Sequence, residues 1–584
     1  MIKTLAKSIR EYKIPSILTP VLVMLEVLFE VIIPFIMAKL VDEGISAGNM
    51  SVILKLGTFL LLSAFLALVS GALAGKTAAH ASAGFAKNLR QDMFYNVQKF
   101  SFSNIDKFST SSIITRLTTD VMNVQNSYQM LIRGAVRSPI MLAFTLFAAF
   151  RINKELSMIF LGAIPVLGIG LFLIIKNAHP IFRKVFKTYD KLNNVVQENL
   201  RGIRVVKAFV REDYEIKKFS DISNEIYERF TKAEKILVFN MPLIQFCMFG
   251  SMLLLSWFGA KAIVASGNNP ALGLTTGQLM SLMTYVMQIL ISLMMLSMIF
   301  VMITISRASA ERIVELINEE TDLKNCENPV FEVADGSIEF KNVSFCYSDK
   351  ADKMILENIN LKIESGETVG IIGGTGSAKT TLIQLIPRLY DVSKGVVKVG
   401  GRDVREYDLK TLRDQVAVVL QKNVLFSGTI KENLKWGDEN ARDEEIKKAA
   451  QIAQADGFIN EFPDKYDTYI EQGGTNVSGG QKQRLTIARA LLKKPKIIIL
   501  DDSTSAVDTK TEALIKKGFT EELSGTTKII IAQRVSSVQD ADKIVVMDNG
   551  KITEIGTHDE LMEKSRIYRE VYESQVKGGV MANV

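Results

Sequence analysis

Six long apolar stretches constrain this chain more than any other feature of its sequence. Each has enough consecutive apolar residues to cross the hydrocarbon core of a bilayer as a helix. They lie at residues 14–40, 53–78, 132–150, 156–176, 236–265 and 274–305. The composition agrees, because 48% of the 584 residues are hydrophobic. Residues 1–317 are therefore expected to form a six-helix transmembrane domain, which excludes a soluble protein.

The charges at the start of the chain indicate its orientation. Lys3, Lys7, Arg10 and Lys13 alternate with apolar residues ahead of the first span, as in an interfacial amphipathic segment. A basic N-terminus favours a cytoplasmic start, and six crossings return the chain to the same side. The first apolar segment is too long for a cleavable signal. We expect a multi-pass protein of the cell membrane whose N-terminus and C-terminal half are cytoplasmic.

Two long polar stretches, residues 79–131 and 177–235, separate the spans and keep a helical periodicity. They are expected to continue the membrane helices well into the cytoplasm. Their tips, near residues 102–120 and 198–213, are candidates for contact with a cytoplasmic domain formed by the second half of the chain. Ordinary helical loops remain the alternative.

Charged residues inside spans are costly and are usually functional. Glu26 and Glu30 lie four residues apart and so share one helix face. That face either lines an aqueous cavity that attracts cationic substrates or bonds to a neighbouring helix. Other cavity candidates, for which lipid-facing or core packing is the favoured alternative, are the sixth-span methionines Met280, Met283, Met287, Met294, Met295, Met298 and Met302 with Phe246, Phe249 and Tyr285.

The second half of the chain contains a strand–loop–helix pattern, VGIIGGTGSAKTTL, at residues 369–382. Small residues allow the loop to curl so that its backbone N–H groups converge on phosphate oxygens. Lys379 would reach the β- and γ-phosphates, and the Thr380 hydroxyl would hold Mg²⁺. Ala378 stands where the pattern has glycine and is tolerable if that residue has helical angles. The predicted ATP-binding residues of this P-loop are Gly373, Gly374, Thr375, Gly376, Ser377, Ala378, Lys379, Thr380 and Thr381.

Residues 318–336 are polar and indicate a linker, after which strands and helices alternate over residues 337–584. This pattern predicts one α/β nucleotide-binding domain with a parallel sheet. The buried-strand run IIIL ends at Asp501, whose carboxylate would bind Mg²⁺ or its waters, and Asp502 follows where a general base would stand. Gln421 would reach Mg²⁺ or the γ-phosphate. The ring of Tyr347 would stack on adenine.

A second phosphate-shaped loop lies at Val477-Ser-Gly-Gly-Gln481, ahead of a helical pattern. One nucleotide does not need two such loops from one chain. We therefore expect a second chain to bring a nucleotide to this loop. The residues expected to contact that nucleotide are Ser478, Gly479, Gly480 and Gln481.

The P-loop, the sequence VSGGQKQRLTIARAL, the strand IIILDD and the six spans together resemble an ATP-binding cassette (ABC) exporter half-transporter of the type IV fold. LFSGTIKENL and GTHDEL are also similar to exporter patterns. The resemblance implies ATP and Mg²⁺ as cofactors. It also implies a head-to-tail dimer in which each ATP lies between one chain's P-loop and the other chain's SGGQ loop, and coupling helices at the tips of the cytoplasmic extensions.

Three residues depart from the family pattern around one nucleotide. Asp502 replaces the usual glutamate, Gln533 replaces the switch histidine, and Ala378 replaces a glycine. A shorter carboxylate would sit back from the water, and an amide cannot become cationic. The chain therefore resembles the degenerate-site subunit of bacterial heterodimeric multidrug exporters, with Asp502, Gln533 and Gln421 as its degenerate catalytic set.

This resemblance implies a second half-transporter chain as partner, membrane lipid as environment and a small hydrophobic or cationic substrate. A homodimeric lipid or peptide exporter with slow hydrolysis is the alternative, and a regulatory ABC protein is a more distant one. The net charge of +7 does not suggest a nucleic-acid partner. The three cysteines have no paired spacing, so neither a disulfide framework nor a zinc site is expected.

Overall fold

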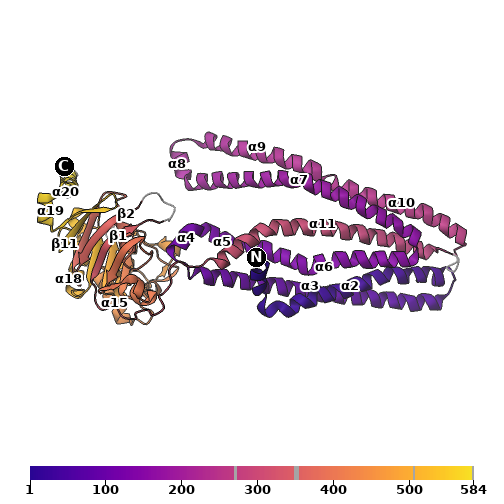
Figure 1. Ribbon diagram of the computed structural model, residues 1–584, viewed down its shortest axis with the longest axis horizontal. Coiled ribbons are helices and arrows are strands. Elements are labelled where there is room, and N and C mark those ends of the chain that lie inside the picture. Colours follow the sequence, from indigo (N-terminus) through magenta and orange to yellow (C-terminus); the bar gives the residue numbers. More distant parts are fainter. Residues whose placement is uncertain (269–272, 348–353, 504–506, 582–584) are drawn as a thin grey trace. The chain divides into compact units, whose positions relative to one another are not determined.

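The computed structural model describes residues 1–268, 273–347, 354–503 and 507–581 (Figure 1). The chain divides into two compact units. The first contains Met1–Gln98 and Thr110–Glu319, and the second contains Lys99–Ser109 and Glu320–Val584. The second unit therefore includes a short segment from the first third of the sequence.

The first unit is entirely helical in its described residues. Its membrane helices extend far beyond the apolar stretches, because polar periodic sequence continues each helix past the bilayer thickness. The helices are α1 (Ile2–Lys7), α2 (Lys13–Lys39), α3 (Met50–Val97), α5 (Thr110–Thr115), α6 (Val121–Ile152), α7 (Lys154–Arg201), α8 (Ile203–Ala208), α9 (Glu212–Leu237), α10 (Asn240–Ser266) and α11 (Thr276–Asn318), with π-helical turns at Leu40–Ile45 and Arg116–Asp120.

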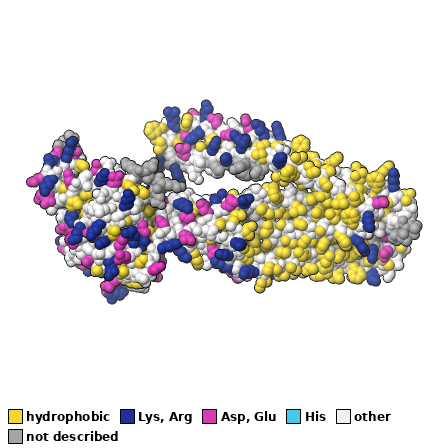
Figure 2. All heavy atoms as spheres, viewed as in Figure 1, with side chains coloured by type: hydrophobic (Ala, Val, Ile, Leu, Met, Phe, Trp, Pro, Cys, Tyr) yellow, Lys and Arg dark blue, Asp and Glu magenta, His cyan; other side chains and the backbone are white. Residues whose placement is uncertain are grey.

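Six of these helical segments are long and apolar enough to span a membrane, which confirms the predicted six-span architecture. Large apolar side chains such as Leu61, Phe65 and Phe147 are exposed along them, as expected for surfaces that face lipid. Figure 2 shows these apolar side chains gathered over the middle of the helices, with charged side chains toward their ends.

Helix α2 packs against α3 and α6, and α6 packs against α11. Helices α7 and α9 form a long hairpin whose tip is the short helix α8 (Figure 1). The start of the chain is fixed to α3, where Asn88 Nδ2 donates to the carbonyl of Ser8 at 2.9 Å and Ser8 Oγ donates to Asp92 at 2.7 Å. The predicted amphipathic segment thus lies against the polar part of α3.

The second unit is an α/β domain with the predicted parallel sheet. Its six-stranded sheet has the order β12-β11-β3-β10-β9-β6, and only the β12–β11 pair is antiparallel. A four-stranded antiparallel sheet, β2-β1-β4-β5, and a small pair, β7-β8, complete the strands. The strands are β1 (Ile338–Phe345), β2 (Leu356–Ile363), β3 (Thr368–Gly373), β4 (Lys394–Val399), β5 (Arg402–Asp403), β6 (Val416–Val419), β7 (Gly428–Thr429), β8 (Tyr469–Ile470), β9 (Ile497–Asp501), β10 (Thr527–Ile531), β11 (Lys543–Asp548) and β12 (Lys551–Gly556).

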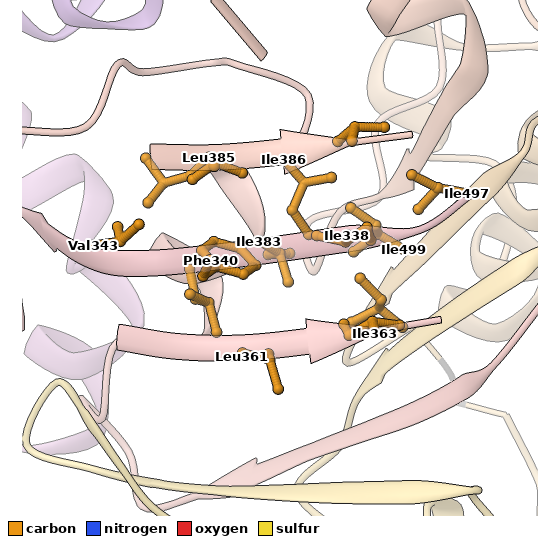
Figure 3. Close-up of a cluster of buried hydrophobic side chains, with 14 of the residues drawn as sticks. Ile338, Phe340, Val343, Leu361, Ile363, Ile383, Leu385, Ile386, Ile497 and Ile499 are labelled. Carbon is orange, nitrogen blue, oxygen red and sulfur yellow. The ribbon is translucent and has the colours of Figure 1, made fainter. Parts of the chain in front are cut away.

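Apolar residues from both larger sheets meet in one core, which fixes the strand ends that carry the site. Figure 3 shows Phe340 and Leu361 of the antiparallel sheet beside Ile383 and Ile499. The helices of this unit are α4 (Phe102–Phe108), α12 (Lys379–Gln384), α13 (Leu409–Gln415), α14 (Ile430–Leu434), α15 (Asp443–Ile452), α16 (Asp456–Glu461), α17 (Gly479–Leu492), α18 (Thr509–Glu522), α19 (His558–Lys564) and α20 (Arg566–Met581).

Candidate functional site

Four neighbouring parallel strands bring the predicted nucleotide-binding residues to one edge of the sheet. Strand β3 pairs with β10, β10 with β9, and β9 with β6, all in parallel. The P-loop follows β3, Gln533 follows β10, and Asp501 ends β9. Because parallel strands end at the same edge, residues more than a hundred positions apart in the sequence become neighbours.

The P-loop connects β3 to α12. Its backbone conformation requires small residues. A Cβ at Gly373 would lie 2.2 Å from the carbonyl oxygen of Met547, so no side chain fits there. Gly376 has a φ of 83°, a conformation open to glycine.

Ala378 also has left-handed angles, with φ 70° and ψ 24° at the N-cap of α12. The condition of ordinary helical angles, under which alanine would be well tolerated, is therefore not met. The Cβ approaches a carbonyl oxygen in this conformation, which costs an L-residue roughly 1–2 kcal/mol. The absent glycine leaves a strained residue at the start of the helix.

The Lys379 ammonium group lies in the centre of the P-loop. Its Nζ donates to the carbonyl oxygens of Gly373 at 2.8 Å and Gly374 at 2.9 Å, and to Ser377 Oγ at 3.2 Å. Burial lowers the pKa of Lys379, although the nearby charges of Asp501 and Asp502 oppose that shift. The loop thus holds a partly desolvated cation where phosphate oxygens would bind.

The predicted magnesium residues lie together. Thr380 Oγ1 donates to Asp501 Oδ2 at 2.9 Å, and Asp501 is only 2% exposed. Burial raises the pKa of Asp501, so its charged form lacks compensation that a cation would supply. Among the described residues there is no group of three or more His, Cys, Asp or Glu suited to a metal. One carboxylate and one hydroxyl nevertheless fit Mg²⁺, because this ion commonly takes its other ligands from waters and phosphates.

The three residues of the predicted catalytic set meet at one carboxylate oxygen. Asp502 Oδ2 accepts a hydrogen bond from Gln533 Nε2 at 2.9 Å and a longer one from Gln421 Nε2 at 3.5 Å. Asp502 has a φ of 49°, and its backbone N–H donates to the carbonyl of Ile531 at 3.0 Å. Burial raises the pKa of Asp502, and the hydrogen bond from Gln421 opposes that shift.

Tyr347 lies beside the P-loop helix, as adenine stacking would require. Its hydroxyl group pairs with Thr381 Oγ1 at 2.9 Å and donates to Gln384 at 3.2 Å. The side chain is 46% exposed, which leaves part of its ring open. The stacking itself stays a prediction.

The SGGQ loop forms a complete helix start. Ser478 is the N-cap of α17, where its N–H donates to Gln481 Oε1 at 2.9 Å and its Oγ accepts from the Gln481 N–H at 3.3 Å. Within the described residues, no hydrogen bond joins Ser478, Gly479, Gly480 or Gln481 to the P-loop. The loop is therefore preformed within its own helix start.

Sequence reasoning missed two residues near this site. Gln575 of α20 donates to the carbonyl of Gln533 at 2.7 Å and accepts from the Val535 N–H at 2.9 Å. These two bonds fix the segment from Gln533 to Val535, here called the switch segment. Tyr390 donates to Asp106 of α4 at 2.9 Å, and its ring centre lies 5.1 Å from that of Tyr347. Neither residue carries a motif, because each contact depends on tertiary packing.

The two glutamates of the first span have a partner that the sequence did not reveal. Arg137 of α6 donates to Glu26 Oε1 and, at 2.9 and 2.8 Å, to both carboxylate oxygens of Glu30. Both glutamates also line a cavity of about 510 Å³. This helix face therefore both bonds to a neighbouring helix and lines a cavity. Attraction of cationic substrates to that cavity stays a prediction.

Of the aromatic cavity candidates, Tyr285 is fully buried, and its hydroxyl donates to the carbonyl of Val31 at 2.9 Å. Its prediction as a cavity residue is wrong, because the hydroxyl group closes a contact between α11 and α2. Phe246 and Phe249 on α10 are exposed.

Comparisons with known proteins agree with this geometry. Residues 16–312 match the family model of the ABC transporter transmembrane region, and residues 356–505 match the ABC transporter model. An uncharacterized ABC transporter ATP-binding protein of Bacillus subtilis (strain 168), YfiB, is 36% identical over 567 residues, which cover 97% of each chain.

Two further relatives have informative names. The ATP-dependent lipid A-core flippase of Desulfotalea psychrophila is 32% identical over 490 residues, which cover 84% of each chain. The solved structure of a bacterial Atm1-family ABC exporter with ATP bound superimposes with a TM-score of 0.80 at 25% identity, over 97% of this chain and 98% of that one.

Proposed function

This chain belongs to the ABC transporter family as an exporter half-transporter, and on that premise we propose that it works as one half of a heterodimer with an unequal pair of ATP sites. Its own P-loop would bind Mg²⁺-ATP and hydrolyse it slowly. Its SGGQ loop would complete a competent site on the partner chain. The cargo would be hydrophobic or amphipathic compounds, drugs and other xenobiotics among them, exported across the cell membrane.

The hydrogen bond from Gln533 to Asp502 carries this proposal. A general base must lie within about 2.6–3.2 Å of the water it activates. Asp502 is one methylene shorter than glutamate, and its Oδ2 already accepts from Gln533 at 2.9 Å and from Gln421 at 3.5 Å. These donors occupy lone pairs of the oxygen that would take the proton from the attacking water. Geometric errors of about 1 Å cost about 100-fold in rate.

The preformed SGGQ loop supports the second part of the proposal. Its capping box is intact, so α17 presents an ordered N-terminus to a nucleotide held elsewhere. If both the P-loop site and the SGGQ loop of this chain had lost their function, an intact SGGQ loop would not be expected. Division of labour between two chains explains the combination.

The tip of the α7–α9 hairpin is suited to contact with a nucleotide-binding domain. Val205, Phe209 and Val210 are 60%, 73% and 80% exposed, although the sequence places them outside the apolar spans. Val210 also has a φ of 50°, which is unusual for a β-branched residue. An exposed apolar tip in a polar stretch is what a docking surface for a nucleotide-binding domain requires.

ATP hydrolysis by the purified chain, alone and co-expressed with a transporter chain from a neighbouring gene, tests the proposal. We expect activity only with the partner, and we expect it to survive Asp502→Ala in this chain. Robust turnover by the chain alone would show that Asp502 and Gln533 suffice for catalysis. It would favour the second candidate function, a homodimeric lipid or peptide exporter, for which the relative named as a lipid A-core flippase is the supporting observation.

A further inference from the structure

A cavity of about 510 Å³ lies among α2, α3 and α6, in the membrane part of the first unit. Glu26 and Glu30 of α2 and Arg133 of α6 line it, with small residues of α3 opposite. On α3 and α6 these residues lie at the end of the apolar stretch that continues into the polar extension. The cavity therefore combines apolar surroundings with charged side chains.

The charges are arranged as a partly satisfied cluster. Arg137 bonds to Glu26 Oε1 and to both oxygens of Glu30, so this triad has a net charge of −1. The Glu26 side chain is only 9% exposed, and its Oε2 is buried without a hydrogen-bond partner in the described structure. A buried carboxylate oxygen without a donor costs free energy, which a ligand N–H would recover once the side chain turns this oxygen toward the cavity.

Arg133 is a cation of the cavity that calls for an anionic partner. It lies one helical turn before Arg137 on α6, so the two cations share a helix face. In the described part of the chain, Arg133 has no ion pair or hydrogen bond, although it is half-buried. Including Arg133, the two carboxylates and two guanidinium groups sum to zero. A cationic ligand would pair with Glu26 and leave Arg133 without a partner, and an anionic ligand would do the reverse.

The α3 wall of the cavity is made of small residues, which leave room for a head group. Ala67, Gly71, Ala72 and Gly75 recur at helical spacing on one face. A Cβ at Gly71 would lie 2.9 Å from Glu26 Oε1, and one at Gly75 would lie 3.6 Å from Arg133 Nη1. The absent side chain at Gly71 is therefore what allows Glu26 its position.

We propose that this cavity binds the head group of a zwitterionic amphiphile. An ammonium group with N–H donors meets Glu26, and an acidic group meets Arg133. The apolar tail extends along the surrounding helices. The inference rests on the proposed export function, because it names the class of cargo, and it differs from the expectation of a small hydrophobic or cationic substrate. A quaternary ammonium group would not serve, because it has no proton to donate to Glu26.

Native mass spectrometry of the detergent-solubilised chain, titrated with lysolipids of one acyl chain, tests this inference. Lysophosphatidylethanolamine offers both charges and an N–H donor. Lysophosphatidylcholine lacks the donor and lysophosphatidylglycerol lacks the cation. We expect the first to bind about tenfold more tightly than either of the others, as one charge-assisted hydrogen bond implies. Equal affinities for all three would overturn the proposal.

Variants locate the binding. Glu26→Gln and Gly71→Ala should each remove the preference for lysophosphatidylethanolamine, the first by charge and the second by displacing the carboxylate. Arg133→Gln should weaken every phosphate-bearing probe. Lys261→Gln, at a lysine that lies over Trp257 on α10, is the control and should change nothing. An unchanged preference in both Glu26→Gln and Gly71→Ala would place the lipid elsewhere and refute the site.

O-phosphoethanolamine, the head group without a tail, distinguishes a lipid source from a soluble one. Weak binding of this probe supports an amphiphile, whereas affinity equal to that of the lysolipid would overturn that part of the assignment. The measurement needs neither ATP nor a partner chain. If the heterodimer experiment failed, the lipid-binding result would still stand. If the lipid-binding measurement failed, the account of the ATP sites would still stand.

Discussion

Gln533 Nε2 lies 2.9 Å from Asp502 Oδ2, so the residues predicted for the switch and general-base positions are hydrogen-bonded to each other. The pair joins the residues that follow β10 and β9, two adjacent parallel strands. Both partners are shorter or less basic than the residues that hydrolytic members of the family carry there. Their mutual contact gives the carboxylate an amide donor in place of an imidazole, with the charges of Lys379 and Arg534 also near it.

Replacing Ser478 with alanine should lower ATP turnover of the complex severely, because this hydroxyl would contact the nucleotide on the partner's competent site. The change also removes a helix cap worth about 1 kcal/mol. Thr557→Ala removes the same kind of capping box from α19 and serves as the matched control. Steady-state ATPase assays of both variants decide the matter, and equal turnover in the two would rule out a specific role for Ser478.

Lys379→Ala should weaken nucleotide binding at this chain's own site without abolishing hydrolysis by the complex. The ammonium group lies within 2.9 Å of two P-loop carbonyl groups and is the cation that the phosphates would meet. Photolabelling with azido-ATP followed by separation of the two chains reports the occupancy of each. Lys394→Ala, an exposed lysine on β4, is the control. Labelling of this chain that stayed at the unsubstituted level would contradict the assignment.

Ala378→Gly should stabilise the nucleotide-binding unit. Glycine adopts the observed φ of 70° freely, which removes roughly 1–2 kcal/mol of strain. The greater freedom of glycine in the unfolded chain returns about 0.4–1 kcal/mol of this. We expect a net gain of about 1 kcal/mol in the free energy of unfolding.

Urea denaturation, followed by the fluorescence of Trp436 in a Trp257→Phe background, measures this change. Ala513→Gly, at an exposed position inside α18, is the matched control and should lower the stability by about 1 kcal/mol. A loss of stability in both variants would show that residue 378 is not strained.

Tyr390→Phe should weaken the connection between α4 and the nucleotide-binding unit. The change removes the 2.9 Å hydrogen bond to Asp106 but keeps the ring that lies beside Phe102 and Tyr347. A hydrogen bond to a charged group contributes about 1.5–3 kcal/mol. We expect ATP binding to remain while stimulation of ATPase activity by transported compounds falls several-fold.

Tyr466→Phe removes a similar 2.7 Å bond to Asp456, remote from α4, and controls for the loss of a buried tyrosine hydroxyl group. Two results would contradict a coupling role for the contact between Tyr390 and α4. One is normal stimulation of ATPase activity in Tyr390→Phe, and the other is an equal reduction in both variants.

Much of this architecture is readable from the sequence, because the signals are local. Six apolar stretches predict six membrane helices, and a buried run that ends in Asp501 predicts a strand delivering a carboxylate to the P-loop. The strand order then explains why Gln421, Asp502 and Gln533 meet. Gln421 and Asp502 are predicted from their positions after apolar runs, and Gln533 from the resemblance to the exporter family.

The rest depends on contacts between distant segments. Arg137 is one charge at the start of a span, and only the packing of α6 on α2 shows that it binds both glutamates. Residue 378 is strained because the loop requires left-handed angles, which composition does not reveal. Gln575 clamps the switch segment from the last helix of the chain, and no motif marks it.

The most direct test of the unequal-site account is to repair this chain's own site. In a complex whose partner carries an inactivated catalytic site, Asp502→Glu combined with Gln533→His should raise hydrolysis well above the residual rate of the unsubstituted chain. We expect a gain of about 100-fold or more, the inverse of the cost of a misplaced base. If the unsubstituted chain already hydrolyses ATP at the repaired rate in that complex, Asp502 and Gln533 are adequate catalytic residues and the asymmetric account is wrong.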